Sequence, residues 1–157
     1  MAQEFTGSMN GAGLRLAIVA TRWNEMVVDK LVSGARGALA RCGVEENAID
    51  LATAPGAYEV PFIARKLAAT GRYHGVVALG CVIRGATPHF DYVAGEAATG
   101  LATAARDTGV PISFGVLTVD TIEQAIERAG TKAGNKGEEA ALACLETINL
   151  CRSIEEA

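Results

Sequence analysis

Short apolar runs alternate along the chain with longer segments of helical periodicity, and this alternation limits the folds that the chain can adopt. The apolar runs cover residues 14–20, 49–54, 75–83 and 110–118. Between them, apolar residues recur at the spacing that places them on one face of a helix. Strands joined by helical crossovers pair in parallel, with helices on both faces of the sheet. The sequence therefore predicts a three-layer α/β/α sandwich around a four-stranded parallel sheet.

Local signals predict where some of the helices begin and end. Asn24 is suited to cap the first helix, and Gly43 to end it, because glycine tolerates a positive φ. Thr121 and Gln124 have the spacing of a capping box and predict a later helix. A loop over residues 131–137 should then lead into the last helix.

Length and charge exclude several classes of protein. The 157 residues suffice for one domain, which we divide into an arm over residues 1–13 and a single domain over 14–157. With 14 basic and 18 acidic side chains, the net charge is −4, so no general positive field favours nucleic acid or an anionic membrane. Half of the residues are hydrophobic, which is too apolar for a disordered chain. No run approaches the roughly 20 apolar residues of a membrane span.

Cysteine and histidine usage predicts neither a metal site nor a disulfide framework. No Cys-x-x-Cys pair occurs, and the two histidines are scattered. Residues 1–10 carry Glu4 and polar side chains where a secretory signal would have an apolar run, so we expect a cytoplasmic protein. The cysteines are Cys42, Cys81, Cys144 and Cys151.

The loops that follow the predicted strands hold most of the unusual residues. In open parallel sheets, ligands bind beyond the carboxyl ends of the strands. The only tryptophan, Trp23, lies directly after the first strand and before the polar Asn24. Trp23 is either a packing residue or a flat platform for a planar heterocycle. The sequence leaves both interpretations open.

The loop after the third strand has the features of an anion site. Thr87 is a suitable N-cap, Pro88 suits the first helical position, and Gly85 and Ala86 let backbone amides approach a ligand closely. A helix N-terminus with unpaired N–H groups can hold a phosphate, and Arg128 could add a bidentate contact. The alternative is a helix cap without a ligand, which is the commoner use of such a sequence.

His89 follows in the first turn of the same helix. The helix dipole disfavours an imidazolium there, so a neutral imidazole that accepts a proton near neutral pH is one interpretation, and a structural histidine is the other. No G-x-G-x-x-G follows a strand and no G-x-x-x-x-G-K-[ST] occurs, which weighs against dinucleotide and P-loop binding. No serine or cysteine has a base beside it as a nucleophile would need.

Long motifs across the chain resemble those of the lumazine synthase family, also described as the riboflavin synthase beta-chain family. The matching segments are residues 55–61 (PGAYEVP), 80–92 (GCVIRGATPHFDY), 114–118 (FGVLT) and 123–137 (EQAIERAGTKAGNKG). The resemblance runs in order over residues 13–152 without a large gap. It implies a flavodoxin-like fold, although the first strand-to-helix loop lacks a flavodoxin-type phosphate loop.

The resemblance also implies a reaction. Members are transferases that condense 5-amino-6-(D-ribitylamino)uracil with 3,4-dihydroxy-2-butanone 4-phosphate to 6,7-dimethyl-8-ribityllumazine. The reaction releases phosphate and water, needs no metal or organic cofactor, and is the penultimate step of riboflavin biosynthesis. A flavin-binding or storage protein and a purely structural shell would share the fold, so the fold alone leaves these alternatives open.

The site residues follow from the same resemblance, position by position. His89 is implied to be catalytic and to move protons. Phe114 is implied to come from the adjacent subunit. The residues implied to bind the ribitylaminouracil are Trp23, Asn24, Ala57, Tyr58, Glu59, Val82, Ile83, Phe114 and Lys136. Those implied to bind the phosphate end of the butanone are Gly85, Ala86, Thr87 and Arg128.

The sequence departs from the family pattern at two positions, and the resemblance also implies an assembly of subunits. Position 23 more often carries Phe, and Cys81 stands where a hydroxyl residue is common. The family forms pentamers, some of which close into icosahedral shells, and the absence of extra residues over 130–137 favours the shell here. The segment before Gly13 would add to a neighbouring subunit's sheet. Association with riboflavin synthase is a further possible partnership.

Overall fold

The computed structural model describes residues 1–157 and confirms the predicted sandwich. Four parallel strands form one sheet in the order β2-β1-β3-β4, so the strand order reverses between β1 and β3. Ligands of such sheets bind at this reversal. The strands are β1 (Leu16–Thr21), β2 (Ile49–Ala54), β3 (Gly75–Ile83) and β4 (Ile112–Val119).

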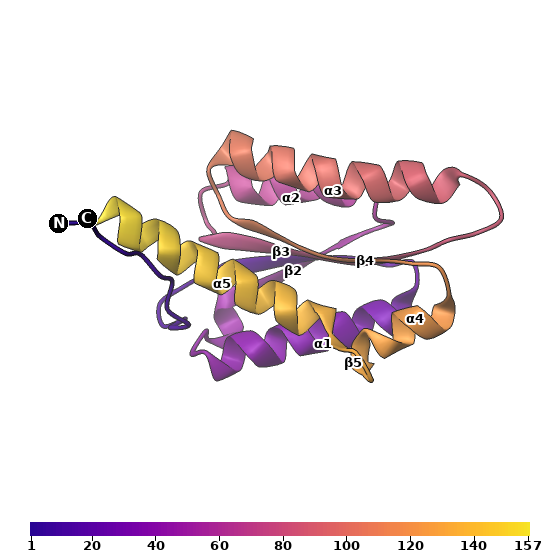
Figure 1. Cartoon of the computed structure of the whole chain (residues 1–157), viewed down its shortest axis with the longest axis horizontal. Coiled ribbons are helices and arrows are strands. Elements are labelled where there is room, and N and C mark those ends of the chain that lie inside the picture. The colour runs from indigo at the N-terminus through magenta and orange to yellow at the C-terminus, as the bar shows by residue number, and fades with distance from the viewer.

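Helices cover both faces of the sheet (Figure 1). One face carries α2 (Val60–Ala69) and α3 (His89–Thr108), and the other carries α1 (Glu25–Arg41), α4 (Ile122–Glu127) and α5 (Lys136–Glu155). A short 3-10 turn, η1 (Glu46–Ala48), precedes β2, and a small hairpin of β5 (Ala129–Thr131) and β6 (Gly134–Asn135) precedes α5.

The core consists of two aliphatic layers, one on each side of the sheet. Along β1, Leu16 and Ile18 face α1 and α5, whereas Ala17 and Val19 face α2 and α3. All of β1 is buried, which explains why its sequence is continuously apolar rather than alternating. Because the core has few large side chains, elements approach closely: a Cβ at Gly137 would lie 2.0 Å from the Leu31 carbonyl oxygen of α1.

Several predicted boundaries are wrong, and backbone hydrogen bonding explains them. β1 begins at Leu16 rather than at residue 14. β4 begins at Ile112 rather than at residue 110, since Pro111 has no N–H to donate and only its carbonyl joins the sheet, accepting from Val76 N–H at 2.9 Å. The predicted loop over 131–137 contains β6, and α5 starts within it because Asn135 Oδ1 accepts the N–H groups of its first turn.

The capping predictions have mixed outcomes. Gly43 does adopt a positive φ, of 96°. The capping box is confirmed on one side, where Gln124 N–H donates to Thr121 Oγ1 at 3.1 Å; the Gln124 side chain, however, accepts from Asp120 N–H at 2.8 Å. Asn24 is the N-cap residue of α1 as predicted, and its carbonyl accepts the Val27 and Val28 N–H groups, but its side chain makes no cap hydrogen bond.

The arm over residues 1–13 contains no regular structure, and part of it lies on its own chain. Gly7 contacts the backbone of α5 so closely that a Cβ there would lie 2.0 Å from the Glu146 carbonyl oxygen. Asn149 Nδ2 donates to the carbonyl oxygens of Ser8 and Asn10. In Figure 1 both termini lie at the same end of the molecule, beyond the end of α5. Pairing of the arm with a neighbouring sheet stays a prediction.

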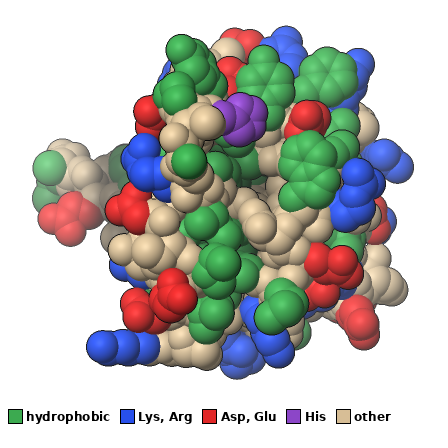
Figure 2. Space-filling view, turned by 90° about the vertical axis from the view of Figure 1, so that its right-hand side faces the viewer, with side chains coloured by type: hydrophobic (Ala, Val, Ile, Leu, Met, Phe, Trp, Pro, Cys, Tyr) green, Lys and Arg blue, Asp and Glu red, His purple; other side chains and the backbone are tan.

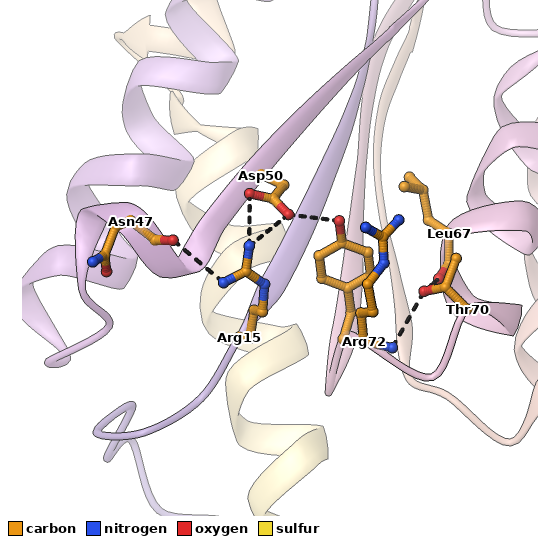
Figure 3. Close-up of polar contacts among 7 residues, drawn as sticks. Arg15, Asn47, Asp50, Leu67, Thr70 and Arg72 are labelled. Atoms are coloured by element: carbon orange, nitrogen blue, oxygen red, sulfur yellow. Dashed lines mark hydrogen bonds and ion pairs between the residues drawn. The ribbon is translucent and has the colours of Figure 1, made fainter.

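The amino ends of the strands are joined by a polar network on the edge opposite the carboxyl ends. Arg15 Nη2 donates to both carboxylate oxygens of Asp50 at 3.1 and 2.9 Å, which links the segment before β1 to β2 (Figure 3). The Tyr73 hydroxyl donates to Asp50 Oδ2 at 2.6 Å, and Arg15 N–H donates to His74 Nδ1 at 2.9 Å. This network fixes three strands at one edge. None of the helices has the length and apolarity needed to cross a membrane.

Candidate functional site

A cavity of about 460 Å³ opens at the carboxyl ends of β1, β2 and β3, where the strand order reverses. Figure 2 looks onto this edge and shows large hydrophobic side chains (green) gathered around a histidine (purple) over its upper part. The cavity brings together eight of the predicted site residues: Trp23, Asn24, Ala57, Tyr58, Glu59, Val82, Ile83 and His89.

Trp23 lies on the wall of this cavity with 59% of its surface exposed, which excludes a buried packing role within the chain. The indole lies over Gly56, where a Cβ would stand 2.3 Å from a ring carbon. The backbone N–H of Trp23 donates to the Pro55 carbonyl at 3.1 Å, and the Thr21 hydroxyl donates to the Trp23 backbone carbonyl at 3.3 Å. The first two loops therefore hold the ring as an open platform.

Asn24 joins the loop after β1 to the end of β3. Its backbone has φ 62° and ψ 41°, the only positive φ at a non-glycine residue. Asn is among the few residues that adopt this conformation readily. Its Nδ2 donates to the Cys81 carbonyl at 2.8 Å rather than to the start of α1. The side chain thus fixes the spacing between Trp23 and the cavity floor.

Glu59 lies at the start of α2, and its carboxylate points back into the second loop. Its Oε2 accepts the Gly56 N–H at 3.1 Å, and the other carboxylate oxygen has no hydrogen-bond or ion-pair partner in the chain. One oxygen therefore stabilises the turn under Trp23, and the other is available to a hydroxyl of a ligand.

The third loop differs from its prediction in one respect. α3 begins at His89 with Pro88 as its N-cap, and no side chain caps it, so Thr87 is not the N-cap. Proline has no backbone N–H to donate, and the Thr87 side chain makes no cap hydrogen bond with α3. The amide groups that find no acceptor in the chain are those of Gly85, Ala86, Thr87, His89 and Phe90. These exposed donors at the start of a helix are the kind of groups that bind anions.

The remaining predicted residues line a second cavity of about 360 Å³ along the free edge of β4. It contains Phe114, Arg128 and Lys136, and it shares no lining residue with the first cavity. Arg128 Nη1 donates to the Gln124 carbonyl at 3.0 Å and lies 3.6 Å from the Glu127 carboxylate. Lys136 forms no ion pair. A single chain therefore presents the predicted residues as two separate surfaces.

Five residues that line the first cavity were not among the predicted site residues: Thr21, Gly56, Cys81, Tyr92 and Val93. Tyr92 follows His89 by one helical turn, and this spacing could have identified it as a neighbour of His89 on the same face. Thr21 carries no comparable signal, because a threonine at the end of a buried strand is ordinary.

Cys81 lines the cavity as a neutral thiol. Burial raises the pKa of this thiol to about 11, so the sulfur is protonated at neutral pH and is no nucleophile. No group of three or more His, Cys, Asp or Glu side chains is arranged to hold a metal ion.

The chain is similar in sequence to a known protein family. The sequence profile of the 6,7-dimethyl-8-ribityllumazine synthase family matches residues 13–152. A 6,7-dimethyl-8-ribityllumazine synthase from Nitratidesulfovibrio vulgaris is 59% identical over 148 residues, which cover 94% of this chain and 95% of that protein. Among solved structures, a de novo designed Rossmann fold protein aligns over 71% of this chain and 90% of its own, with a TM-score of 0.41 and 18% identity.

Proposed function

The chain belongs to the 6,7-dimethyl-8-ribityllumazine synthase family, and from this premise we propose how its residues carry out the family's reaction. The enzyme condenses 5-amino-6-(D-ribitylamino)uracil with 3,4-dihydroxy-2-butanone 4-phosphate in riboflavin biosynthesis. The observation that carries our assignment is one cavity that holds an exposed indole, a carboxylate and an imidazole beside a row of unpaired amides.

The pyrimidine ring stacks on Trp23, because an exposed indole face in an otherwise aromatic-poor chain offers a large planar contact. Backbone groups of Val82 and Ile83, at the end of β3, bind the ring edge, and Asn24 holds the two loops at the required separation. The free oxygen of Glu59 accepts hydrogen bonds from the ribityl hydroxyls. The backbone at Ala57 and Tyr58 completes this half of the cavity.

The butanone phosphate binds at the start of α3. The unpaired amides from Gly85 to Thr87 and at His89, together with the helix dipole, provide charge stabilisation without a metal ion. The same end of the helix carries the His89 imidazole into the cavity. The phosphate group and the proton-transfer group therefore lie next to each other.

The chemical steps match this arrangement. The uracil amine attacks the ketone to form an imine and water, and a proton then leaves the adjacent carbon as the phosphate departs. The enol that results tautomerises and closes the ring with loss of a second water. His89 serves the proton transfers, and the amides stabilise the departing anion. Holding both reactants in one cavity lowers the entropic cost of the first step.

We infer that Phe114, Arg128 and Lys136 act on the first cavity of a neighbouring subunit. Their own cavity lies along the free edge of β4 and is separate from the first. In this proposal Phe114 covers the bound ring, Arg128 contacts the phosphate, and Lys136 adds a further cation. A pentamer, closed into an icosahedral shell, provides such neighbours, with riboflavin synthase as a possible associate. The proposed location is the cytoplasm.

The test uses the two substrates and the fluorescence of the lumazine product. His89→Ala should lower kcat by about 100-fold, because proton transfer by a positioned side chain accelerates a reaction by at least about that factor. The KM of either substrate should change much less. His74→Gln, at the opposite edge of the sheet, is the matched control and should retain turnover. An unchanged kcat in His89→Ala would exclude the proton-transfer role.

A further inference from the structure

Arg84 lies at the base of the loop that carries the unpaired amides, and its side chain is held by three groups. Nε donates to Asp120 Oδ1 at 2.9 Å, and Nη1 lies 3.5 Å from Asp91 Oδ1. The guanidinium carbon stands 4.3 Å from the centre of the Phe90 ring. Arg84 N–H also donates to the Val119 carbonyl at 2.8 Å. The side chain thus connects the loops after β3 and β4 with the start of α3.

The two carboxylates that Arg84 contacts lie near the proposed phosphate loop, because Arg84 directly precedes Gly85. Asp91 belongs to the first turn of α3, so its negative charge faces the same helix end as the phosphate would. Asp120 begins the turn after β4, and Gln124 fixes its backbone through the Asp120 N–H. Without a cation between them, both carboxylates would repel an incoming phosphate dianion.

We propose that Arg84 is a positioning residue whose charge neutralises Asp91 and Asp120, so that the phosphate-bearing substrate can bind at the amides of residues 85–90. This inference rests on the proposed function of that loop. We assign Arg84 a role through the two carboxylates because its Nε and Nη1 atoms contact Asp120 and Asp91, and its guanidinium lies over the Phe90 ring. The hydrogen bond to Asp120 also raises the pKa of Arg84 above its ordinary value.

The first measurement is the kinetics of Arg84→Gln. The KM for the butanone phosphate should rise about fivefold, with little change in kcat, because the partly exposed carboxylates act through solvent-screened Coulomb repulsion. Raising the ionic strength should shrink this increase, as screening predicts. Arg65→Gln is the matched control: Arg65 pairs with Asp107 between α2 and α3, away from both cavities, and its loss should leave KM unaffected.

The decisive measurement is rescue by removing a carboxylate. Asp120→Asn in the Arg84→Gln background should restore most of the lost affinity, although it restores no contact of residue 84. Arg84→Lys, which retains the charge without the planar geometry, should also recover most of it. An unchanged KM in Arg84→Gln, or an increased KM that Asp120→Asn leaves in place, would overturn the proposal.

Two further readouts separate this inference from the function on which it rests. Affinity for inorganic phosphate, measured by calorimetry, should fall about as much in Arg84→Gln as the KM for the butanone phosphate rises. This measurement does not depend on catalytic turnover. Absence of product with the unmodified protein would contradict the proposed function alone. If Arg84→Gln does not fold, Asp120→Asn by itself remains informative: its KM for the phosphate substrate should fall, and a rise would overturn the proposal.

Discussion

At the residue scale, the first cavity depends on small groups that hold larger ones. Gly56 has no side chain, and the Trp23 ring fills the space that a Cβ would need. Asn24 adopts a left-handed backbone conformation and bonds to the Cys81 carbonyl. Neither residue has reactive chemistry of its own, yet both fix the position of the groups that contact a substrate.

Gly56→Ala should displace the indole and raise the KM for the ribitylaminouracil about tenfold, because a Cβ there would stand 2.3 and 2.4 Å from two ring carbons. Steady-state kinetics together with Trp23 fluorescence would measure both effects. The smaller ring of Trp23→Phe leaves room for the methyl group, so Gly56→Ala should cost less in that background. An equal cost in both backgrounds would show that the ring is not what the methyl group disturbs.

At the element scale, stability depends on close approach between helices and on the polar network at the amino ends of the strands. α1 and α5 pack against each other, and Gly137 lies where the two helices approach too closely for a side chain. A hydrogen bond also joins these two helices: Asn135 Nδ2, at the start of α5, donates to the Lys30 carbonyl of α1 at 3.0 Å.

Gly137→Ala should lower the free energy of unfolding by about 3 kcal/mol, because its methyl group would collide with the Leu31 backbone and force the two helices apart. Urea denaturation would measure the loss. Gly37→Ala in α1 is the control, since its nearest neighbour is the flexible end of Arg41 at 3.3 Å. That variant should unfold at the same or a slightly higher urea concentration.

The network around Asp50 predicts a pH dependence of stability. The Tyr73 hydroxyl and then Arg15 lower the pKa of Asp50 below its ordinary value of 3.8. Because the pKa of Asp50 is lower in the folded state, ionised Asp50 stabilises the fold. This stabilisation is fully present above about pH 4 and is lost as the pH falls through the folded-state pKa. The same hydrogen bond raises the pKa of Tyr73 above 10.0, so its contribution is present below about pH 10 and is lost as the pH rises further.

Tyr73→Phe tests this network by urea denaturation across the pH range. The variant should be less stable than the unmodified protein at neutral pH, and the two should converge in acid, where Asp50 is protonated. Tyr92→Phe removes a hydroxyl from an exposed tyrosine and should match the unmodified protein throughout. A constant difference between Tyr73→Phe and the unmodified protein down to pH 2 would argue against the link to Asp50.

At the scale of the whole molecule, the two cavities on one chain hold complementary sets of residues. The first has the platform, the imidazole and the amides, and the second has the aromatic and cationic side chains of Phe114, Arg128 and Lys136. In our proposal each working site combines the first cavity of one subunit with the second cavity of its neighbour.

Mixed assemblies of two impaired variants test this proposal. Subunits with His89→Ala and subunits with Arg128→Ala should together regain activity after being unfolded and refolded as an equal mixture, because about a quarter of the subunit contacts would join two intact cavities. Fluorescence of the product gives the rate. A mixture of His89→Ala with Trp23→Ala, both altered in the first cavity, should gain nothing. Equal rates in the two mixtures would mean that each chain completes its own site.

The sequence by itself determined the parallel sandwich, its crossovers and the loops that carry the chemistry, because hydrophobic periodicity and glycine positions are local properties. Only the tertiary structure decided how side chains are used. The Asn24 side chain bonds to a carbonyl 57 residues away instead of to the first turn of α1, and the missing cap at Thr87 leaves amides unpaired. The structure likewise places Arg128 in a different cavity from the one that His89 lines. Such choices depend on partners that are distant in the sequence, and local patterns carry no information about them.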